Sequence, residues 1–394
     1  MGRVIGRQLL FVLGIKRLHG TKIREKGQTI WYSILKSVTL SSNFRPSCLG
    51  CFADMTFDDN TYMKRCFYLA RLGRGYVAPN PMVGCVVVAQ GRIIGEGYHR
   101  QHGGPHAEVN ALNSVKERHL LPESTVYVNL EPCSHYGKTP PCADRLVCEG
   151  VKKVVISNLD PNPQVAGRGI AKLQAAGIEV VTGVLEKEGY NLNKRFFTYF
   201  TQHRPYIILK WAQTADGFLD AFDDKPIRIS TDISKALVHQ MRAEESAILV
   251  GTQTALKDNP SLHTRRWFGK HPLRIAIDKS LKIPSTHHLL DGSQPTMIVN
   301  ATQTNELYWQ VDFSKNIIPE LLTELYTRKI QSIIIEGGQK TLQSFIEGNY
   351  FDEIQVEIGS YCCMQGTPAP IITQEGLRQE IRHIGDATFM HYYR

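Results

Sequence analysis

The sequence predicts an α/β fold in two domains, and three observations lead to this prediction. The chain has 394 residues, more than a single hydrophobic core usually organises. Apolar residues make up 42% and charged residues 21%, which are ordinary values for a globular protein. Strand-like apolar runs alternate with helical stretches along most of the chain, as in an α/β layer architecture with a largely buried sheet.

The first 54 residues are set apart by their charge. They hold nine Lys or Arg against Glu25 and Asp54, a net charge of +7, which leaves only +2 of the total of +9 for all later residues. The run RQLLFVLGIKR has a basic flank and a short apolar stretch, but no small-residue cleavage site follows it. We interpret residues 1–54 as a poorly structured extension upstream of a working start at Met55; the alternative is an organellar transit peptide.

The remaining composition bears on location and partners. No run approaches the roughly 20 apolar residues of a membrane-spanning helix. Nine cysteines are scattered without the dense, even pattern of a secreted disulfide scaffold. We therefore predict a cytoplasmic protein. A nearly neutral body without a clustered basic face predicts neither nucleic acid nor membrane as a partner.

The first domain, residues 55–203, is predicted to begin with an amphipathic helix. The regular pattern begins at Asp58: apolar residues from Met63 recur at helical spacing after acidic N-cap candidates, and the helix should end near Gly73 and Gly75. Strands are expected at residues 83–88 and in the runs RIIGEG, TVYVNL, VKKVVIS and IEVVTG, with helices beginning near His106, Cys142 and Gly167.

The polar stretch YFTQHRP, residues 199–205, is predicted to interrupt this pattern and to mark the domain boundary. A second α/β series, in a domain of residues 204–394, begins with PYIILKWA. Its strands are expected in YIILKWA, SAILVGT, LRIAID, TMIVN, SIIIEGG and EIQVEIG, and its helices near residues 233–244, 319–329 and 340–348.

The stretches HAEVNAL and NLEPCSHYGKTPPCAD carry the clearest chemical signal, because they order His106, Glu108, Cys133 and Cys142. One imidazole and two thiolates can hold zinc and leave its fourth position for water. Glu108 could carry a proton beside that water without binding the metal. The order H-x-E then P-C is the pattern of zinc-dependent nucleobase deaminases.

The sequence thus predicts a catalytic zinc held by His106, Cys133 and Cys142, with Glu108 as the catalytic residue. The alternative is a structural zinc clip, or a core histidine with two buried cysteines. Neither of those sites would need Glu108.

The spacing of the two cysteines departs from the generic pattern, since eight residues separate them instead of two. PCSHYGKTPPC resembles the signature of the bifunctional riboflavin-biosynthesis deaminase/reductase family, and NPMVGCVVV, GEGYH, PHAEVNAL and DPNPQVAGRGI extend the resemblance across the first domain. The resemblance implies a cytidine-deaminase-like α/β/α fold. It also implies zinc-dependent hydrolytic deamination of a diaminopyrimidinone that carries a ribosylamino 5′-phosphate. Asn80, His99 and Lys138 occupy positions that the family uses to hold this substrate.

The second domain resembles the reductase half of the same family in LKWAQTADG, ILVGTQTALKDNPSLHTR and IIIEGG. This implies a dihydrofolate-reductase-like α/β fold and hydride transfer from NADPH that converts the ribosyl group to ribityl. Without the resemblance, IIIEGGQKTL would be only a weak dinucleotide signal. By position, the cofactor would contact Ala212, Arg228, Thr254, Asp258 and Gly338, and the substrate would contact Arg242, Leu262, Arg265 and Glu336.

FDDKPIRIST departs from the family's common polar-aromatic version, which bears on Arg228 and Ser230. The resemblance also favours a homo-oligomer. One rival function is a nucleic-acid deaminase of the tRNA adenosine type with a nucleotide-binding accessory domain; the weak charge after residue 54 and the long cysteine loop argue against it. The other rival is a non-enzymatic zinc-stabilised binding module, in which Glu108→Gln would change nothing.

Overall fold

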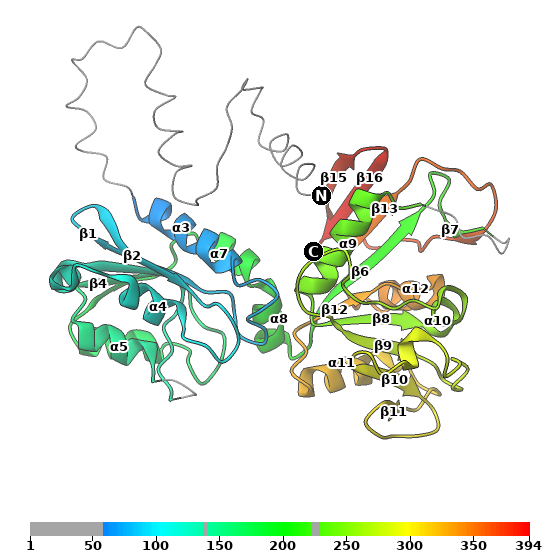
Figure 1. The fold of residues 1–394 in the computed structure, drawn as a ribbon, viewed down its shortest axis with the longest axis horizontal. Helices are drawn as coiled ribbons and strands as arrows, with labels where there is room; N and C mark the ends of the chain where they lie inside the picture. The colour runs from blue at the N-terminus through cyan, green and yellow to red at the C-terminus, as the bar shows by residue number, and fades with distance from the viewer. Residues whose placement is uncertain (1–57, 137–139, 222–228) are drawn as a thin grey trace, which may run out of the picture. The chain divides into compact units, whose positions relative to one another are not determined.

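The computed structural model describes residues 58–136, 140–221 and 229–394 (Figure 1). Residues Phe57–Arg394 form one compact unit. The predicted N-terminal extension, Lys138 and Arg228 lie outside the described residues. No helix in the described ranges is long and apolar enough to cross a bilayer.

The first half contains a five-stranded sheet in the order β2-β1-β3-β4-β5. β1 is antiparallel to β2 and β3, and β3, β4 and β5 run parallel. Every residue of β1 is buried, as its unbroken apolar sequence GCVVVA predicts for a strand that is covered on both faces. The strands are β1 (Gly84–Ala89), β2 (Arg92–Tyr98), β3 (Thr125–Leu130), β4 (Lys153–Asn158) and β5 (Glu179–Val181).

Helices cover both faces of this sheet and give the predicted α/β/α arrangement. Successive side chains of a strand point to opposite faces, so Cys85 and Val87 pack in one core with α4, α5 and α6, and Val86 and Val88 pack in another with α3 and α7. Of the acidic N-cap candidates, Asp58 caps α3: its carboxylate accepts from the Thr61 N–H at 2.9 Å. The helices are α3 (Asp59–Arg71), α4 (Ala107–Ser114), α5 (Cys142–Glu149), α6 (Arg168–Ala175) and α7 (Glu186–Leu192), with a 3₁₀ turn at Arg118–Glu123.

The prediction that YFTQHRP interrupts the regular pattern is wrong for its first four residues. Helix α8 (Lys194–Gln202) continues through them, because Phe196, Phe197 and Phe200 pack together with Leu130. The helix ends at His203, whose φ of 54° is left-handed. Neither α7 nor α8 was predicted from the sequence.

The second half contains a nine-stranded sheet in the order β11-β10-β9-β8-β12-β6-β13-β16-β15. The strands from β11 to β13 run parallel, and β16 and β15 add an antiparallel hairpin at one edge. β7 (Phe218–Asp220) and β14 (Thr367–Pro368) pair separately. The sheet comprises β6 (Tyr206–Gln213), β8 (Ala247–Gly251), β9 (Leu273–Ile277), β10 (Thr296–Asn300), β11 (Tyr308–Gln310), β12 (Ser332–Ile335), β13 (Glu353–Ile358), β15 (Arg378–Ile384) and β16 (Ala387–Tyr393).

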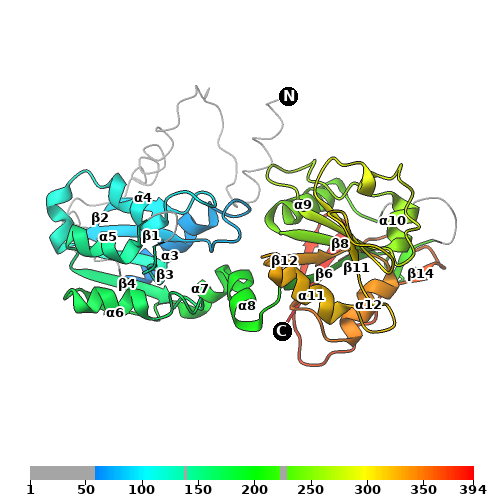
Figure 2. The same ribbon diagram turned by 90° about the horizontal axis from the view of Figure 1, so that it is seen from below.

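Helices again cover both faces of the parallel part (Figure 2). α9 (Asp232–Glu244) and α10 (Thr252–Asp258) lie over one face, and α11 (Ile318–Thr327) and α12 (Gln339–Glu347) lie over the other. A 3₁₀ turn spans His288–Leu290. Each strand and helix predicted for this half is present. The hairpin β15–β16 was missed because β15 is mostly exposed and has no apolar run.

Candidate functional site

The predicted metal ligands converge beside the ends of β3, α4 and α5. His106 is the N-cap residue of α4, Cys142 is the first residue of α5, and Cys133 lies after β3. Their ligand atoms all lie within 4.8 Å of one another. The His106 Nδ1 atom is 3.5 Å from the Cys133 Sγ atom and 3.3 Å from the Cys142 Sγ atom. The long loop between the cysteines therefore closes on a single site.

The local electrostatics favour a thiolate at this site. The Cys142 N–H, at the start of α5, donates to the Cys133 Sγ atom at 3.3 Å. Hydrogen bonds from Cys142 and His106 lower the pKa of Cys133 to about 4, against the effect of burial. The hydrogen bond with Cys133 raises the pKa of His106 to about 9. One imidazole nitrogen and two sulfurs match zinc in ligand type and number, and leave a position open.

Glu108 lies in the first turn of α4, two residues after His106, and its side chain is buried. Burial raises the pKa of Glu108 to about 6, although the nearby His106 acts to lower it. A cavity beside the metal cluster is lined by Glu108 together with His106 and Cys133. A carboxyl group that titrates near neutral pH beside a metal site can both accept and return a proton.

Asn80 and His99 line this cavity, whose volume is about 550 Å³. The Asn80 Nδ2 atom lies 3.1 Å from His99 Nε2, and His99 Nδ1 lies 3.0 Å from the Pro105 carbonyl oxygen. Nδ1–H of His99 thus donates to Pro105, and Nε2 accepts from Asn80. Burial lowers the pKa of His99. Since both ring nitrogens are engaged, His99 orients the Asn80 amide at the cavity wall.

Sequence reasoning missed two acidic residues in this region, Glu131 and Asp160. The Glu131 carboxylate accepts hydrogen bonds from the backbone N–H groups of Gly167 and Gly169, both at 3.0 Å. Glu131, which directly follows β3, is thereby connected to the loop in the motif DPNPQVAGRGI. Burial raises the pKa of Asp160, which also lines the cavity, to about 7. Glu131 lies in NLEPCSHYGKTPPCAD and Asp160 lies in DPNPQVAGRGI, and both motifs were identified from the sequence. The local sequence does not indicate which groups surround each carboxylate in the fold.

A second buried charge cluster lies in the other half of the chain. An Nη2 atom of Arg242, near the end of α9, lies 2.6 Å from the Oε2 atom of Glu336, which directly follows β12. Burial acts to raise the pKa of Glu336, but the charges of Arg242 and Lys210 lower it overall. Glu336 Oε1 and Arg242 Nε are buried without a hydrogen-bond partner in the part of the chain that the structure describes. Lys210 was not predicted.

Three of the predicted cofactor contacts lie near the carboxyl ends of adjacent parallel strands. Ala212 is near the end of β6, Thr254 lies in α10 after β8, and Gly338 precedes α12 after β12. Gly338 has a φ of 67°, and a Cβ atom there would lie 3.3 Å from Thr254 Oγ1. Among the residues that the structure describes, no side chain caps α12. The N–H groups of its first turn therefore suit a phosphate group of a dinucleotide.

The remaining predicted residues differ in how far they can reach a ligand. Leu262 packs in the core beneath α9 and α10, so a ligand could meet only its main chain. Arg265 is exposed, and its backbone N–H donates to His239 Nδ1 at 3.2 Å. Asp258 is exposed at the end of α10.

Glu357 was also missed by sequence reasoning. It pairs in register with Ala212 and is buried on β13. Its Oε2 atom accepts from the Ser230 hydroxyl at 2.7 Å. Its Oε1 atom has no partner in the described ranges. Glu357 adds a second buried carboxylate to this side of the sheet.

Each half of the chain matches a known protein family. The pattern of the cytidine and deoxycytidylate deaminase zinc-binding region matches residues 56–158, and that of the RibD C-terminal domain matches residues 205–390. Riboflavin biosynthesis protein RibD of Aquifex aeolicus is 42% identical over 328 residues, 81% of this chain and 89% of that protein. Its counterpart in Escherichia coli is 35% identical over 365 residues, 84% and 98% of the two chains.

Solved structures resemble most of the chain. The diaminohydroxyphosphoribosylaminopyrimidine deaminase/5-amino-6-(5-phosphoribosylamino)uracil reductase of Thermotoga maritima has a TM-score of 0.77 at 34% identity, and the match covers 85% of this chain and 98% of that one. Acinetobacter baumannii RibD has a TM-score of 0.78 at 30% identity, with the same two coverages.

Proposed function

Since this chain belongs to the RibD family of riboflavin biosynthesis proteins, we propose how its residues divide the work of the family's two reactions. The chain is a bifunctional enzyme with a zinc-binding deaminase domain and an NADPH-dependent reductase domain, and it acts on a small-molecule substrate. The observation that carries the assignment of residues is the cluster of His106, Cys133 and Cys142 with Glu108 at the wall of the same cavity.

In the deaminase site, His106, Cys133 and Cys142 would hold zinc, which would supply an activated water. The Glu108 carboxylate accepts a proton during the attack of water and returns it to the departing amine. The substrate is the diaminopyrimidinone ribosylamino 5′-phosphate; its 2-amino group leaves as ammonia and the ring carbon gains the oxygen. Asn80, oriented by His99, holds the ring, and Lys138 is a further substrate contact.

In the reductase site, bound NADPH would supply the hydride for conversion of the ribosyl group to ribityl. Ala212, Thr254, Asp258, Gly338 and Arg228 contact the cofactor. The substrate meets Arg242 and Glu336, each of which has a buried polar atom without a partner among the described residues, together with the main chain of Leu262. Arg265 offers a guanidinium fork to the substrate phosphate. The chemistry here rests on positioning, because the reacting hydride comes from the cofactor.

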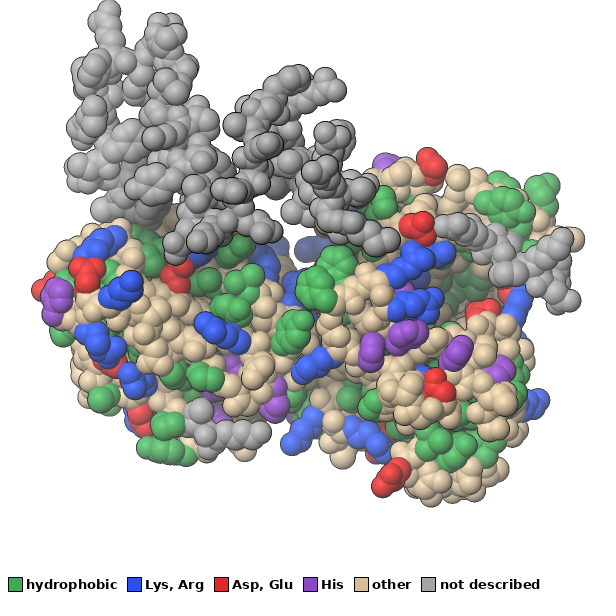
Figure 3. All heavy atoms as spheres, viewed as in Figure 1, with side chains coloured by type: hydrophobic (Ala, Val, Ile, Leu, Met, Phe, Trp, Pro, Cys, Tyr) green, Lys and Arg blue, Asp and Glu red, His purple; other side chains and the backbone are tan. Residues whose placement is uncertain are grey.

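Several broader features belong to the same proposal. The deaminase domain spans residues 55–203 and the reductase domain residues 204–394, after an extension of residues 1–54. The enzyme works in the cytoplasm as a homo-oligomer and does not bind nucleic acid. On the face drawn in Figure 3, Lys and Arg side chains are interspersed with acidic, apolar and other polar side chains and form no continuous basic strip among the described residues, which supports the last point.

Mass spectrometry of the products tests this assignment. The diaminopyrimidinone ribosylamino phosphate is incubated with zinc-loaded protein, with NADPH added or withheld. We expect one amine to be exchanged for oxygen without NADPH, and two further hydrogens to be gained with it. Unchanged substrate in the presence of folded, zinc-loaded protein would overturn the substrate assignment and favour a nucleic-acid deaminase.

A Cys133→Ser variant separates the two sites. It should lose deamination but still reduce the deaminated compound when that is supplied, because Cys133 belongs only to the metal cluster. Cys148→Ser is the matched control, since Cys148 is exposed on α5 and should leave both activities intact. Loss of both activities in folded Cys133→Ser protein would contradict independent sites.

A further inference from the structure

The cavity beside the zinc cluster is not built by the deaminase domain alone. Its lining includes Tyr326 from the end of α11, and Lys329 and Gln331 from the connection that leads to β12, all in the reductase domain. The opposite part of the lining includes Glu108 and Asp160. At about 550 Å³, the cavity is of the size that takes a ligand larger than a pyrimidine ring.

Direct contacts hold this segment, residues 326–331, against the deaminase domain. The Tyr199 hydroxyl of α8 donates to the Tyr326 carbonyl oxygen at 3.0 Å, and the centroids of the two rings are 4.6 Å apart. The Gln331 side-chain amide donates to the Pro79 carbonyl oxygen at 2.6 Å, next to Asn80. Lys329 lies between these two anchors, so its main chain has a fixed position at the cavity.

Lys329 also has an unusual backbone conformation. It follows α11 with a φ of 61°, in the left-handed region that glycine normally occupies at the end of a helix. Its backbone N–H donates to the Tyr326 carbonyl oxygen at 2.9 Å. The neighbouring Arg328 forms an ion pair with Glu324 at 2.7 Å, whereas Lys329 has no ion pair in the described part of the chain. Lys329 is thus a free cation held in a strained conformation at the cavity.

The distribution of charge in the cavity lining indicates which part of the substrate Lys329 can bind. Among the described lining residues it is the only lysine or arginine. The acidic residues Glu108, Glu131 and Asp160 lie in the deaminase half of the lining. A substrate whose pyrimidine ring lies beside Glu108 must place its phosphate away from these carboxylates. A primary ammonium group on a flexible stem is a common ligand for phosphate.

We propose that Lys329, although it belongs to the reductase domain, binds the 5′-phosphate of the substrate in the deaminase site. The second domain thereby completes the binding pocket of the first. The inference rests on the deaminase function and site proposed above. It adds a binding residue to the first reaction and gives a physical reason for the two domains to share one chain.

Steady-state deamination by the full-length enzyme tests the proposal with Lys329→Met, Lys329→Arg and Arg328→Met. Each variant is assayed with the substrate and with the same compound lacking its phosphate. In Lys329→Met we expect KM for the phosphorylated substrate to rise about tenfold with kcat unchanged, because a contact remote from the reacting carbon strengthens binding alone. Lys329→Arg should restore most of this loss. Arg328→Met should resemble the parent, and none of the variants should change turnover of the compound without phosphate.

The outcomes separate this inference from the function on which it rests. If the parent enzyme does not deaminate the substrate, the proposed function fails. If the parent is active and Lys329→Met has an unchanged KM, the phosphate contact is absent. An equal loss with and without the phosphate would also overturn the proposal, because it would indicate a structural role at the end of α11.

Discussion

Glu108 owes its chemistry to its surroundings. A carboxyl group in water is fully ionised at neutral pH, but burial raises the pKa of Glu108 to about 6. This brings the titration of the group closer to neutral pH, where a carboxyl group can more readily accept and return a proton. The surroundings of His99 act in the opposite direction, since burial lowers its pKa, and its ring lies against the Asn80 amide.

The variant Glu108→Gln tests the proton transfer. Glutamine has nearly the same shape but cannot carry a proton, so kcat for deamination should fall on the order of 10²- to 10⁴-fold. Zinc content per chain, measured by atomic absorption, should remain that of the parent because Glu108 is not a ligand. Glu117→Gln, in an exposed ion pair with Arg92, is the control. Parental turnover in Glu108→Gln would show that the proton is carried by another group.

His239 makes the stability of the reductase half depend on pH. Burial, with the charges of Arg242 and Arg265, lowers its pKa to about 4 from an ordinary 6.5. Between these values the unfolded chain binds a proton that the folded chain does not. The stabilisation present above pH 6.5 is therefore lost as the pH falls toward 4.

We expect the unfolding free energy to fall by about 1–2 kcal/mol between pH 7 and pH 5 through this group. His239→Asn should reduce that fall, since the asparagine oxygen can still accept from the Arg265 N–H but does not titrate. Urea unfolding followed by tryptophan fluorescence measures it, because Trp211, Trp267 and Trp309 all lie in this half. An identical pH dependence in the variant and the parent would assign the effect to other groups.

Helix α6 is positioned by contacts that also reach the metal site. The Glu131 carboxylate accepts from the Gly169 N–H at 3.0 Å and so ties the first turn of α6 to the end of β3. A Cβ atom on Gly169 would clash with the Pro132 carbonyl oxygen, one residue before Cys133. The packing of α6 and the position of the proposed zinc ligand Cys133 are therefore linked through the backbone at Pro132.

Gly169→Ala should destabilise the protein by about 2 kcal/mol or more, because neither backbone can move without disturbing its neighbours. The variant should also hold less zinc. Gly150→Ala is the comparison: Gly150 ends α5 with a φ of 64°, and a Cβ atom added there would meet nothing within 4 Å, so strain alone should cost about 1 kcal/mol. Chemical denaturation and zinc content measure both variants, and a larger loss in Gly150→Ala would contradict the steric argument.

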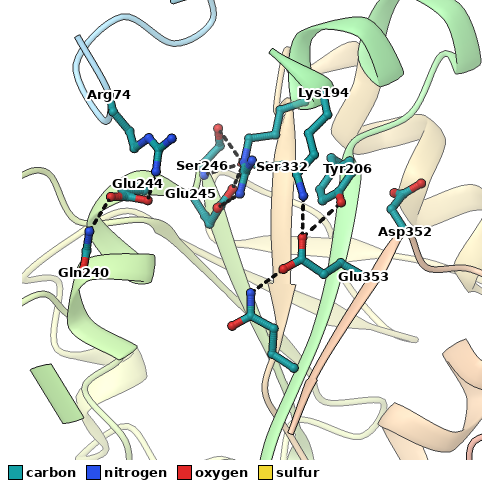
Figure 4. A network of polar contacts seen from close by, with 12 residues as sticks. Arg74, Lys194, Tyr206, Gln240, Glu244, Glu245, Ser246, Ser332, Asp352 and Glu353 are labelled. Carbon is teal, nitrogen blue, oxygen red and sulfur yellow. Dashed lines mark hydrogen bonds and ion pairs between the residues drawn. The ribbon is translucent and has the colours of Figure 1, made fainter. Parts of the chain in front are cut away.

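The two domains are joined by a buried set of charges between α8 and the second sheet (Figure 4). Lys194 Nζ lies 2.8 Å from Glu353 Oε2, which also accepts from the Tyr206 hydroxyl. Arg195 binds the carboxylate of Glu245, whose side chain is only 1% exposed. These pairs fix the helix that also contributes to the wall of the deaminase cavity, so the interface and the first active site share one element.

Arg195→Met leaves the Glu245 charge buried without this partner, and we expect a loss of about 3–5 kcal/mol in the free energy of unfolding. The double variant Arg195→Met/Glu245→Leu should be less destabilised than the single one, because no buried charge is left over. Arg382→Met breaks an exposed pair with Glu380 and should cost no more than about 1 kcal/mol. If the single and double variants lose the same free energy, the buried charge is not the cause.

Much of the fold could be predicted because local patterns carry it. The apolar runs of β1 and the parallel strands are buried on both faces, and the capped start of α3 is visible as Asp58 before a helical repeat. The elements that were missed lack such a pattern. α8 mixes polar residues with its Phe cluster, and β15 is mostly exposed, so each depends on packing against distant partners.

The sequence by itself determined which residues could form a metal cluster, which carboxyl group we predict as its proton carrier, and the order of the two domains, because ligand types, their order and a long cysteine loop are all readable along the chain. Only the tertiary structure decided which groups are buried, which charges face one another and which domain lines which cavity. Glu357, Asp160 and Lys329 have no local signal. Their surroundings come from segments far apart in the sequence, and burial and Coulomb interaction depend on distance in space.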